Sequence, residues 1–334
     1  IHFCMSKRRS QSFQMTPRTP RGTIIDGQRW PPGFKPDNVR SAKKMKPRPD
    51  DIFVCTFAKS GTTWIQHIVH LLLDKAVYDA TIDNGDVVSS TKQGKHTTLF
   101  LESPMIEQVG AANVDGFKSP RVLKSHFNYR DMPKGGEAKY IFACRNPKDV
   151  LTSFYHHHRN FKILDFENGD FDVFFELFMK GHVAMGDYFD HLTSWLKEID
   201  QARERILVLT YEDMVADLRS AVVQIANFIG GKAVEVISNE RQLAKIVEAS
   251  SFNSMKKNQQ RWVPMQIMTR PLFIRKGKSR DWKNYFSHEQ SERMDERFRD
   301  SLGATAAAEW WRAEMEWSED EFAEKDVDLL QSKL

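Results

Sequence analysis

The sequence predicts an α/β fold of three layers, in which a central parallel sheet has helices on both faces. Four short, mainly apolar runs at residues 52–57, 121–124, 140–145 and 206–209 alternate with longer amphipathic segments. Such runs are typical of strands buried on both faces, and strands that alternate with helices are typical of a parallel sheet. In these sheets, binding groups gather at the carboxyl ends of the strands. We therefore expect the functional residues directly after these four runs.

The two ends of the chain differ in composition from its middle, and we expect three regions. Residues 1–33 predict a flexible basic arm, because they contain Ser, Arg, Gln and Pro with little apolar periodicity. Met5 is a candidate natural start within this arm. Residues 34–318 are expected to form one domain, and residues 319–334 an acidic, solvated tail. The turn-rich apolar patch at residues 30–34 could close over the core or over a binding pocket.

The first apolar run ends in a turn that has the composition of an anion site. Residues 57–61 are Phe-Ala-Lys-Ser-Gly, and a helix with an apolar face is expected from Thr62. The first turn of a helix presents free backbone N–H groups, and the helix dipole favours negative charge there. Lys59 adds a positive charge, and Ser60, Thr62 and Thr63 add hydroxyl groups. The segment predicts a phosphate-binding turn, although a plain strand-to-helix connection is the alternative.

Periodicity divides the rest of the chain into helices and irregular segments. Residues 74–118 are expected to be irregular, with a polar loop over 83–95 and an apolar lip over 99–104. Helices are predicted where apolar residues recur at helical spacing: residues 147–158, with Pro147 at the first helical position, 171–180, 188–199, 216–229, 240–249 and the segment from His288 onward. Residues 256–280 are basic and lack clear periodicity.

Composition and charge argue against several classes of partner. The 334 residues are 40% hydrophobic and 28% charged, and a formal net charge of +4 is too small to predict nucleic-acid binding. No apolar run approaches the roughly 18–20 residues of a membrane span, so we expect no membrane partner. Cys55 and Cys144 fall in predicted strands, which favours a reducing compartment such as the cytoplasm. The final tripeptide, Ser332-Lys333-Leu334, matches a peroxisomal address and leaves that location as the alternative.

The turn at residues 59–64, Lys-Ser-Gly-Thr-Thr-Trp, does not fit the Walker A pattern, because its lysine precedes Gly61. It resembles the 5′-phosphosulfate loop of the cytosolic sulfotransferases, which usually have Tyr-Pro where this chain has Phe57-Ala58. Those enzymes transfer a sulfonate group from 3′-phosphoadenosine 5′-phosphosulfate (PAPS) to a hydroxyl group or an amine and release PAP. The resemblance covers roughly residues 34–303. It implies a P-loop-like nucleotide-binding topology, a small-molecule acceptor and no metal.

The resemblance extends to the segments that would hold the 3′-phosphate of PAPS. Arg145 follows the third predicted strand and Ser153 lies eight residues later, as in the family's 3′-phosphate segment. Arginine suits phosphate because its planar guanidinium donates two hydrogen bonds at once. The segment Phe273-Ile274-Arg275-Lys276-Gly277 resembles the start of the family signature Arg-Lys-Gly-x-x-Gly-x-Trp-Lys, but Arg280 replaces the second glycine. If that position requires a positive φ, Arg280 is strained; otherwise a further cation faces the nucleotide.

Two groups of aromatic and apolar residues follow from the same comparison. The resemblance implies that the adenine slot is lined by Trp64, Tyr211, Ser250, Phe252 and Met255. Taken singly, each of these residues would be assigned to the core, and only the resemblance singles them out. Aromatic residues in the predicted loops favour a lipophilic acceptor, such as a phenol, a steroid or another alcohol: Phe34, Phe100, Phe127, Phe161 and Phe166.

The resemblance also implies the catalytic residues. Lys124-Ser125-His126 matches the family's Lys-Thr-His, whose histidine is the general base, and an imidazole has a suitable pKa for that role. Lys59 would stabilise the leaving phosphate oxygen, and Lys124 would hold the sulfonate oxygens. Ser153 would restrain Lys59 until the acceptor is bound. For His126 considered alone, a structural role is the alternative.

Two other functions are compatible with parts of this pattern. A P-loop kinase or other NTPase would need a glycine before the lysine, an aspartate that holds Mg²⁺ and usually an Arg-rich lid, and none of these is evident in the sequence. A non-catalytic nucleotide-binding protein would tolerate the loss of Lys59 and His126, yet the chain has both.

Two local motifs carry weaker predictions. Three consecutive histidines occupy residues 156–158, but adjacent residues of a helix point in different directions, so they predict no metal site. The family's dimer segment has a lysine, a Thr-Val pair and a glutamate. Here the corresponding residues are Lys283, Ser287-His288 and Glu292, so the flanking charges are present without the central pair. A weak homodimer is therefore only a possible partner.

Overall fold

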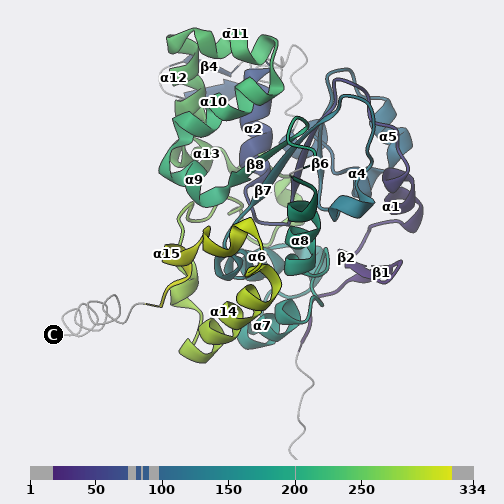
Figure 1. Cartoon of the computed structure of the whole chain (residues 1–334), viewed down its shortest axis with the longest axis vertical. Coiled ribbons are helices and arrows are strands. Elements are labelled where there is room, and N and C mark those ends of the chain that lie inside the picture. Colours follow the sequence, from purple (N-terminus) through teal and green to yellow (C-terminus); the bar gives the residue numbers. More distant parts are fainter. Residues whose placement is uncertain (1–17, 74–79, 84–85, 90–97, 200, 318–334) are drawn as a thin grey trace, which may run out of the picture.

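The computed structural model describes residues 18–73, 80–83, 86–89, 98–199 and 201–317, and its centre is a four-stranded parallel sheet (Figure 1). The strand order is β6-β3-β7-β8, and every neighbouring pair is parallel. These strands are β3 (Ile52–Thr56), β6 (Val122–Ser125), β7 (Lys139–Cys144) and β8 (Ile206–Thr210). The predicted α/β fold with a parallel sheet is thus confirmed, and all four strands lie where the apolar runs predict them.

Helices cover both faces of the sheet (Figure 1). Their bounds are α1 Pro36–Lys43, α2 Thr62–Leu72, α3 Leu99–Glu102, α4 Ile106–Val109, α5 Ala111–Asp115, α6 Pro147–Asn160, α7 Phe171–Met179, α8 Tyr188–Ile199, α9 Tyr211–Ala216, α10 Leu218–Ile229, α11 Lys232–Ser238, α12 Glu240–Ala249, α13 Phe252–Lys257, α14 His288–Leu302 and α15 Arg312–Met315. Two short antiparallel hairpins lie outside the central sheet: β1 (Thr23–Ile25) with β2 (Gln28–Trp30), and β4 (Ala80–Asp83) with β5 (Asp86–Ser89).

Side chains of the sheet alternate between two hydrophobic clusters, because successive strand residues point to opposite faces. Phe53 and Phe142 belong to the cluster that includes residues of α6, α8 and α14. Val54 and Ile141 belong to the other cluster, with residues of α2, α10 and α12. This alternation gives the molecule its three layers and leaves only the ends of the strands for binding.

Polar side chains fix the starts of several helices. The Asn146 side chain caps α6 by accepting a hydrogen bond from the backbone N–H of Asp149 at 2.9 Å, and Pro147 takes the first helical position. At the start of α14, Ser287 and Gln290 form a reciprocal capping box. These caps satisfy backbone N–H groups at the starts of α6 and α14.

The structure differs from the sequence-based expectation in three places. The segment expected to be irregular, 74–118, contains the β4–β5 hairpin and the helices α3 to α5 in its described parts. The helix expected over 216–229 is present as α10, which begins two residues later because Asp217 caps it by accepting from the backbone N–H of Ser220 at 2.9 Å, and the short helix α9 before it was not expected. A short helix, α11, follows Gly230 and Gly231 directly; the glycines end α10 as expected but do not start a loop.

The described part of the N-terminal arm, from residue 18, packs against the domain. Trp30 is completely buried, its ring stacks on Phe34 with centroids 5.3 Å apart, and it meets Phe127 edge-on. The sequence offered little periodicity here because the β1–β2 hairpin depends on these tertiary contacts.

The acidic tail lies outside the described residues, and the domain boundaries stay a prediction. None of the helices in the described ranges has the length and apolar character needed to cross a membrane.

A buried ion pair joins the amino ends of β3 and β6. The guanidinium of Arg121 donates to the Asp51 carboxylate through Nε at 2.7 Å and through Nη2 at 2.5 Å, and both side chains are fully buried. The second carboxylate oxygen also accepts from the backbone N–H of Arg48 at 2.7 Å. Removing Asp51 would leave the buried Arg121 charge with the exposed Asp115 carboxylate, 3.2 Å away, as its remaining acidic partner among the described residues.

We therefore predict that Asp51→Ala lowers the free energy of unfolding by about 3–5 kcal/mol. Chemical denaturation followed by circular dichroism would measure this loss. Asp26→Ala is the matched control, because Asp26 pairs with Arg40 on the surface and its loss should change stability far less. Equal effects of the two substitutions would contradict the assigned importance of the buried pair.

Candidate active site

A cavity of about 450 Å³ opens at the carboxyl edge of the sheet, where β3, β6 and β7 end. Sixteen of the predicted site residues line it: Lys59, Gly61, Thr62, Thr63, Trp64, Lys124, His126, Arg145, Ser153, Tyr211, Phe252, Met255, Phe273, Arg275, Lys276 and Gly277. Ser60 and Ser250 are fully buried and do not belong to this lining. Residues that are far apart in the sequence are thus brought together in a single site.

The turn between β3 and α2 has the left-handed backbone that its glycine permits. Gly61 is the N-cap of α2 with φ +95°, and no side chain caps this helix among the described residues. A Cβ atom at Gly61 would lie 3.3 Å from the Tyr211 ring. Lys59 also has a positive φ, of +75°, which is costly for a residue with a side chain. The strained, uncapped turn faces the cavity, as expected of an anion site.

Burial lowers the pKa values of two lysines in the cavity, Lys59 and Lys124, and the proximity of other positive charges lowers that of Lys59 further. Desolvation in the cavity, followed by the proximity of Arg145, Arg275 and Lys124, lowers the pKa of Lys59 to about 7. Desolvation also lowers the pKa of Lys124 to about 8, against the opposing effect of Glu107. A bound anion would relieve this repulsion and restore ordinary lysine pKa values.

His126 is oriented by the backbone of β3. Its Nδ1 lies 2.7 Å from the carbonyl oxygen of Thr56, which can only accept, so Nδ1 carries the proton and Nε2 has the free lone pair. Burial, together with the nearby Lys124 and Lys59, lowers the pKa of His126 to about 4. At neutral pH the imidazole is therefore uncharged, and its lone pair can accept a proton.

A buried carboxylate beneath His126 was missed by the sequence analysis. Glu107 is fully buried, and its Oε1 accepts hydrogen bonds of 2.6 Å from the Ser125 hydroxyl and from the backbone N–H of His126. Burial raises the pKa of Glu107 to about 7. Glu107 lies in a segment that we expected to be irregular, so the sequence did not predict that its side chain would contact Ser125 and His126. That contact forms because α4 packs against β6.

Arg145 lies at the end of β7 with its guanidinium in the cavity wall. Nη2 donates to the carbonyl oxygen of Lys278 at 3.0 Å, and the guanidinium lies 4.1 Å from the centre of the Tyr211 ring. Its carboxylate neighbour, Asp149, is 3.7 Å away. The Nε atom is buried and has no hydrogen-bond partner among the described residues. Because Arg145 also lines the cavity, its terminal N–H groups can donate to a bound ligand.

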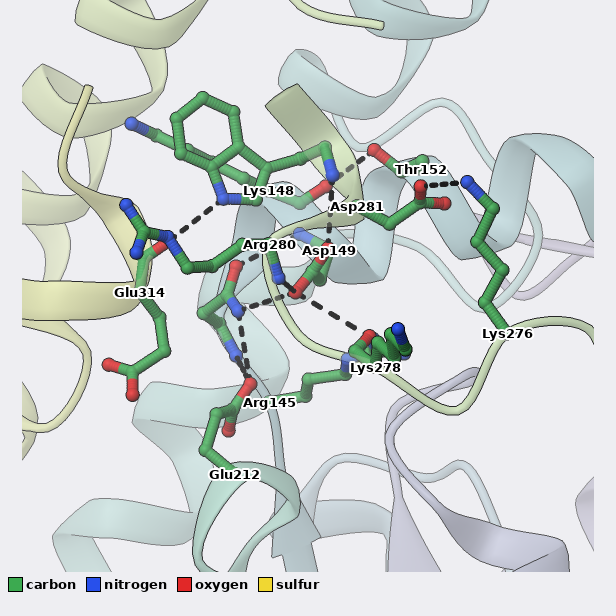
Figure 2. Close-up of polar contacts among 12 residues, drawn as sticks. Arg145, Lys148, Asp149, Thr152, Glu212, Lys276, Lys278, Arg280, Asp281 and Glu314 are labelled. Atoms are coloured by element: carbon green, nitrogen blue, oxygen red, sulfur yellow. Dashed lines mark hydrogen bonds and ion pairs between the residues drawn. The ribbon is translucent and has the colours of Figure 1, made fainter. Parts of the chain in front are cut away.

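Asp149 holds the basic segment 275–282 against α6 (Figure 2), and Asp281 pairs with two cations of that same segment. The backbone N–H groups of Arg280 and Trp282 donate to the two Asp149 carboxylate oxygens at 2.7 and 3.2 Å. Arg275 and Lys276 each contact Asp281 at 2.5 Å. These contacts bring the cations of the segment to the cavity wall.

Arg280 occupies a position that favours glycine. Its φ is +67°, so the strain expected for a side chain at this point of the family signature is present. Its side chain extends toward Glu314 and does not line the cavity (Figure 2). The alternative expectation, a further cation facing the nucleotide, is therefore wrong.

Some of the residues that we expected near the adenine and the acceptor line the cavity, and others do not. The Trp64 indole N–H donates to the carbonyl oxygen of Ser250 at 2.8 Å, and its ring lies beside Tyr211 in the cavity wall. Of the aromatic residues expected near the acceptor, three line the cavity: Phe34, Phe100 and Phe161. The other two do not. Phe127 packs under Trp30, and Phe166 packs against Phe174, because both are needed to fill the core.

The three consecutive histidines take separate roles. His156 lies against Tyr285, His158 bonds through Nδ1 to the carbonyl oxygen of Phe154 at 2.8 Å, and His157 lines the cavity beside Phe161. In the part of the chain that the structure describes, no group of His, Cys, Asp or Glu side chains is arranged to bind a metal ion.

The family and the relatives that match this sequence are sulfotransferases. A family model described as "Sulfotransferase domain" matches residues 49–306. Sulfotransferase 1C2 from Oryctolagus cuniculus is 34% identical over 277 residues, which cover 80% of this chain and 88% of the relative. The corresponding Homo sapiens protein is 33% identical and covers 81% and 89%.

Two solved structures share the fold. Mouse sulfotransferase SULT7A1 complexed with PAP has a TM-score of 0.67 and 26% identity, covering 85% of this chain and 96% of the mouse chain. Retinol dehydratase in a complex with retinol and PAP has a TM-score of 0.63 and 25% identity, covering 80% and 85%. The chain therefore belongs to the sulfotransferase family, and it is an enzyme that uses PAPS as its sulfonate donor.

Proposed function

We propose that this sulfotransferase transfers the sulfonate group of PAPS to a hydroxyl group, or an amine, of a small lipophilic acceptor, with His126 as the general base. The observation that carries this proposal is the convergence of Lys59, Lys124, His126 and Arg145 on one cavity. At neutral pH the His126 imidazole is uncharged and has a free lone pair, and the lysine and arginine side chains surround the place for a polyanion.

The residues around the cavity fit the donor. The cavity lining includes five cationic side chains, and a nucleotide with two anionic ends can pair with them: Lys59, Lys124, Arg145, Arg275 and Lys276. We assign the 5′-phosphosulfate to Lys59, Ser60, Gly61, Thr62 and Thr63. We assign the 3′-phosphate to Arg145, Ser153, Phe273, Arg275, Lys276 and Gly277. Trp64, Tyr211, Ser250, Phe252 and Met255 are assigned to the adenine.

Gly277 supports the assignment of the 3′-phosphate segment. Its φ is +61°, and a Cβ atom at this position would lie 2.1 Å from the Phe252 ring. Only glycine lets the backbone of the basic segment approach Phe252 so closely. The two assigned subsites, for phosphate and for adenine, are thereby brought into contact.

The chemistry follows from the charge states of the side chains. PAPS supplies the sulfonate and a phosphate leaving group. His126 Nε2 accepts the proton of the acceptor hydroxyl, since its Nδ1–H is engaged by Thr56. Lys59 stabilises the charge that develops on the leaving oxygen, and Lys124 holds the sulfonate oxygens. Ser153, which lines the same cavity, restrains Lys59 until the acceptor is bound.

The lining of the cavity supports a lipophilic acceptor. Beyond the cations, the walls include Phe34, Phe100, Phe161, Trp262 and Ile267. Apolar walls bind a ligand by removing its apolar surface from water. The solved relative retinol dehydratase binds retinol, a lipophilic alcohol, together with PAP. A panel of phenols, steroids, other alcohols, amines and sugars with radiolabelled PAPS would test this class, and transfer to sugars alone would contradict it.

The remaining properties stay predictions. We expect no nucleic-acid or membrane partner and at most a weak homodimer. A cytoplasmic location is expected, and the alternative peroxisomal address lies outside the described residues. Import of a reporter that carries the last dozen residues would decide between them.

We predict that His126→Ala lowers kcat at least about a hundredfold, because the acceptor hydroxyl loses its base, while PAP still binds. Turnover with an accepted phenol or alcohol and calorimetric titration with PAP would measure the two effects. The exposed His182 serves as control, since His182→Ala should leave both values unchanged. Full turnover in His126→Ala would refute the general-base assignment.

The same assays test the two other functions. Mg²⁺-dependent turnover with ATP would favour a kinase instead, and PAP binding without any turnover would favour a non-catalytic protein.

We also predict that the affinity for PAP falls as the pH rises above 7. The pKa of Lys59 is about 7 and that of Lys124 is about 8 in the free cavity, and bound phosphates raise both values. The stabilisation of the complex is therefore complete below pH 7 and is lost as the pH rises through the raised values. Calorimetry should show a Kd at least about tenfold weaker at pH 9 than at pH 7, with proton uptake on binding.

Lys59→Arg is the control for this pH dependence. A guanidinium keeps its charge throughout the range, so the slope of Kd against pH should become shallower. The phosphates of PAP do not cause the slope, because their second ionisation is complete near pH 7. An unchanged slope in Lys59→Arg would show that Lys59 does not titrate in the free site.

A further inference from the structure

Three residues on one face of α6 border the cavity at successive helical turns: Ser153, His157 and Phe161, the last being the C-cap residue. Residues four apart lie on the same face of a helix, and each such step advances about 6 Å along the axis. Ser153 lies at the end assigned to the donor, and Phe161 belongs to the apolar wall. His157 therefore lies between the donor end and the apolar part of the cavity.

The His157 ring is held in place but makes no hydrogen bond to the described residues. It stacks on Phe161 with centroids 4.1 Å apart and an angle of 24°, and it lies beside Phe154 at 5.8 Å. Its Nδ1 is enclosed and unpaired, whereas Nε2 is not among the enclosed atoms. A buried N–H without a partner is rarer and more costly than an unused lone pair. The proton therefore lies on Nε2, at the part of the ring that borders the cavity.

The surroundings of His157 keep the ring neutral and favour an oxygen ligand. Burial, and then the proximity of Lys59, His158, His126 and Lys124, lower its pKa well below the usual range for histidine. A neutral ring in this position offers one N–H donor. The nearby ammonium groups attract the same kind of ligand atom, an oxygen with free lone pairs.

We propose that His157 selects acceptors that carry a second oxygen close to the hydroxyl group that is sulfonated, by donating its Nε2–H to that oxygen. The oxygen belongs to an alkoxy, carbonyl or hydroxyl group on the same ring as the reacting hydroxyl or on the adjacent one, since His157 lines the same cavity as His126 and Lys59 and lies close enough to both to interact with their charges. This inference rests on the proposed acceptor class. An acceptor without such an oxygen leaves the N–H unpaired once water is expelled, which lowers its affinity.

Three isosteric pairs of phenols test this inference: 2-, 3- and 4-methoxyphenol against 2-, 3- and 4-ethylphenol. Within each pair, an ether oxygen replaces a methylene group and little else changes. We would measure kcat/KM with PAPS and, independently of turnover, the Kd of each phenol for the enzyme–PAP complex. For at least one ring position, the methoxyphenol should be preferred about tenfold in both measurements, the size of one hydrogen bond at the upper end of its usual range.

Two variants separate recognition from structure. His157→Phe keeps the aromatic ring without the N–H, so it should reduce the preference to near one. His157→Gln restores an N–H donor and should recover part of the preference. Calorimetric titration with PAP and thermal unfolding would show whether the donor site and the fold are intact in both variants.

Several outcomes would overturn the inference. Equal values within all three pairs, or a preference that persists in His157→Phe, would exclude recognition by His157. In those cases, transfer to the phenols themselves would leave the proposed function standing. If no phenol is sulfonated and none binds to the enzyme–PAP complex, both this inference and the phenolic acceptor class are wrong.

Discussion

Repulsion among cations that are removed from water is the constraint on which this active site depends. Lys59, Lys124, Arg145 and Arg275 border one cavity, and their proximity and burial disfavour the charge of Lys59 in the free protein. The carboxylates that offset this repulsion lie behind the cations: Asp149 pairs with Arg145, and Asp281 pairs with Arg275. The side of these cations that faces the cavity therefore stays positive. A bound elongated polyanion supplies the negative charge that no side chain of the described residues provides on that side.

The parallel sheet makes this arrangement possible and also made it predictable. Four apolar runs marked β3, β6, β7 and β8, because strands buried on both faces contain few polar residues. Helices with a regular apolar face, such as α8 and α12, were predicted at their observed bounds. The elements that were not predicted are held by tertiary contacts. The β1–β2 hairpin is anchored by Trp30, and the helices α3 to α5 are too short to show a period.

The candidate site was predictable to the extent that its residues follow strands or stand in a motif. Lys59, His126 and Arg145 meet both conditions, and all three line the cavity. Glu107 and His157 meet neither, since the first lies in a short helix and the second is one histidine among three. Phe127 and Phe166 were wrongly predicted to lie near the acceptor, although both are buried in the core. An aromatic residue in a predicted loop is equally suited to a pocket wall and to the core, and the sequence does not distinguish them.

The cavity walls have two separate origins in the chain. One part of the cavity lining comes from the ends of the strands and from α6. The other part comes from three connecting segments, which contribute the residue pairs Pro31 and Phe34, Leu99 and Met105, and Trp262 and Ile267. No strand of the central sheet runs through these segments. Related enzymes can therefore diverge in what they sulfonate by exchanging these connecting segments alone, with the machinery for the nucleotide inherited unaltered.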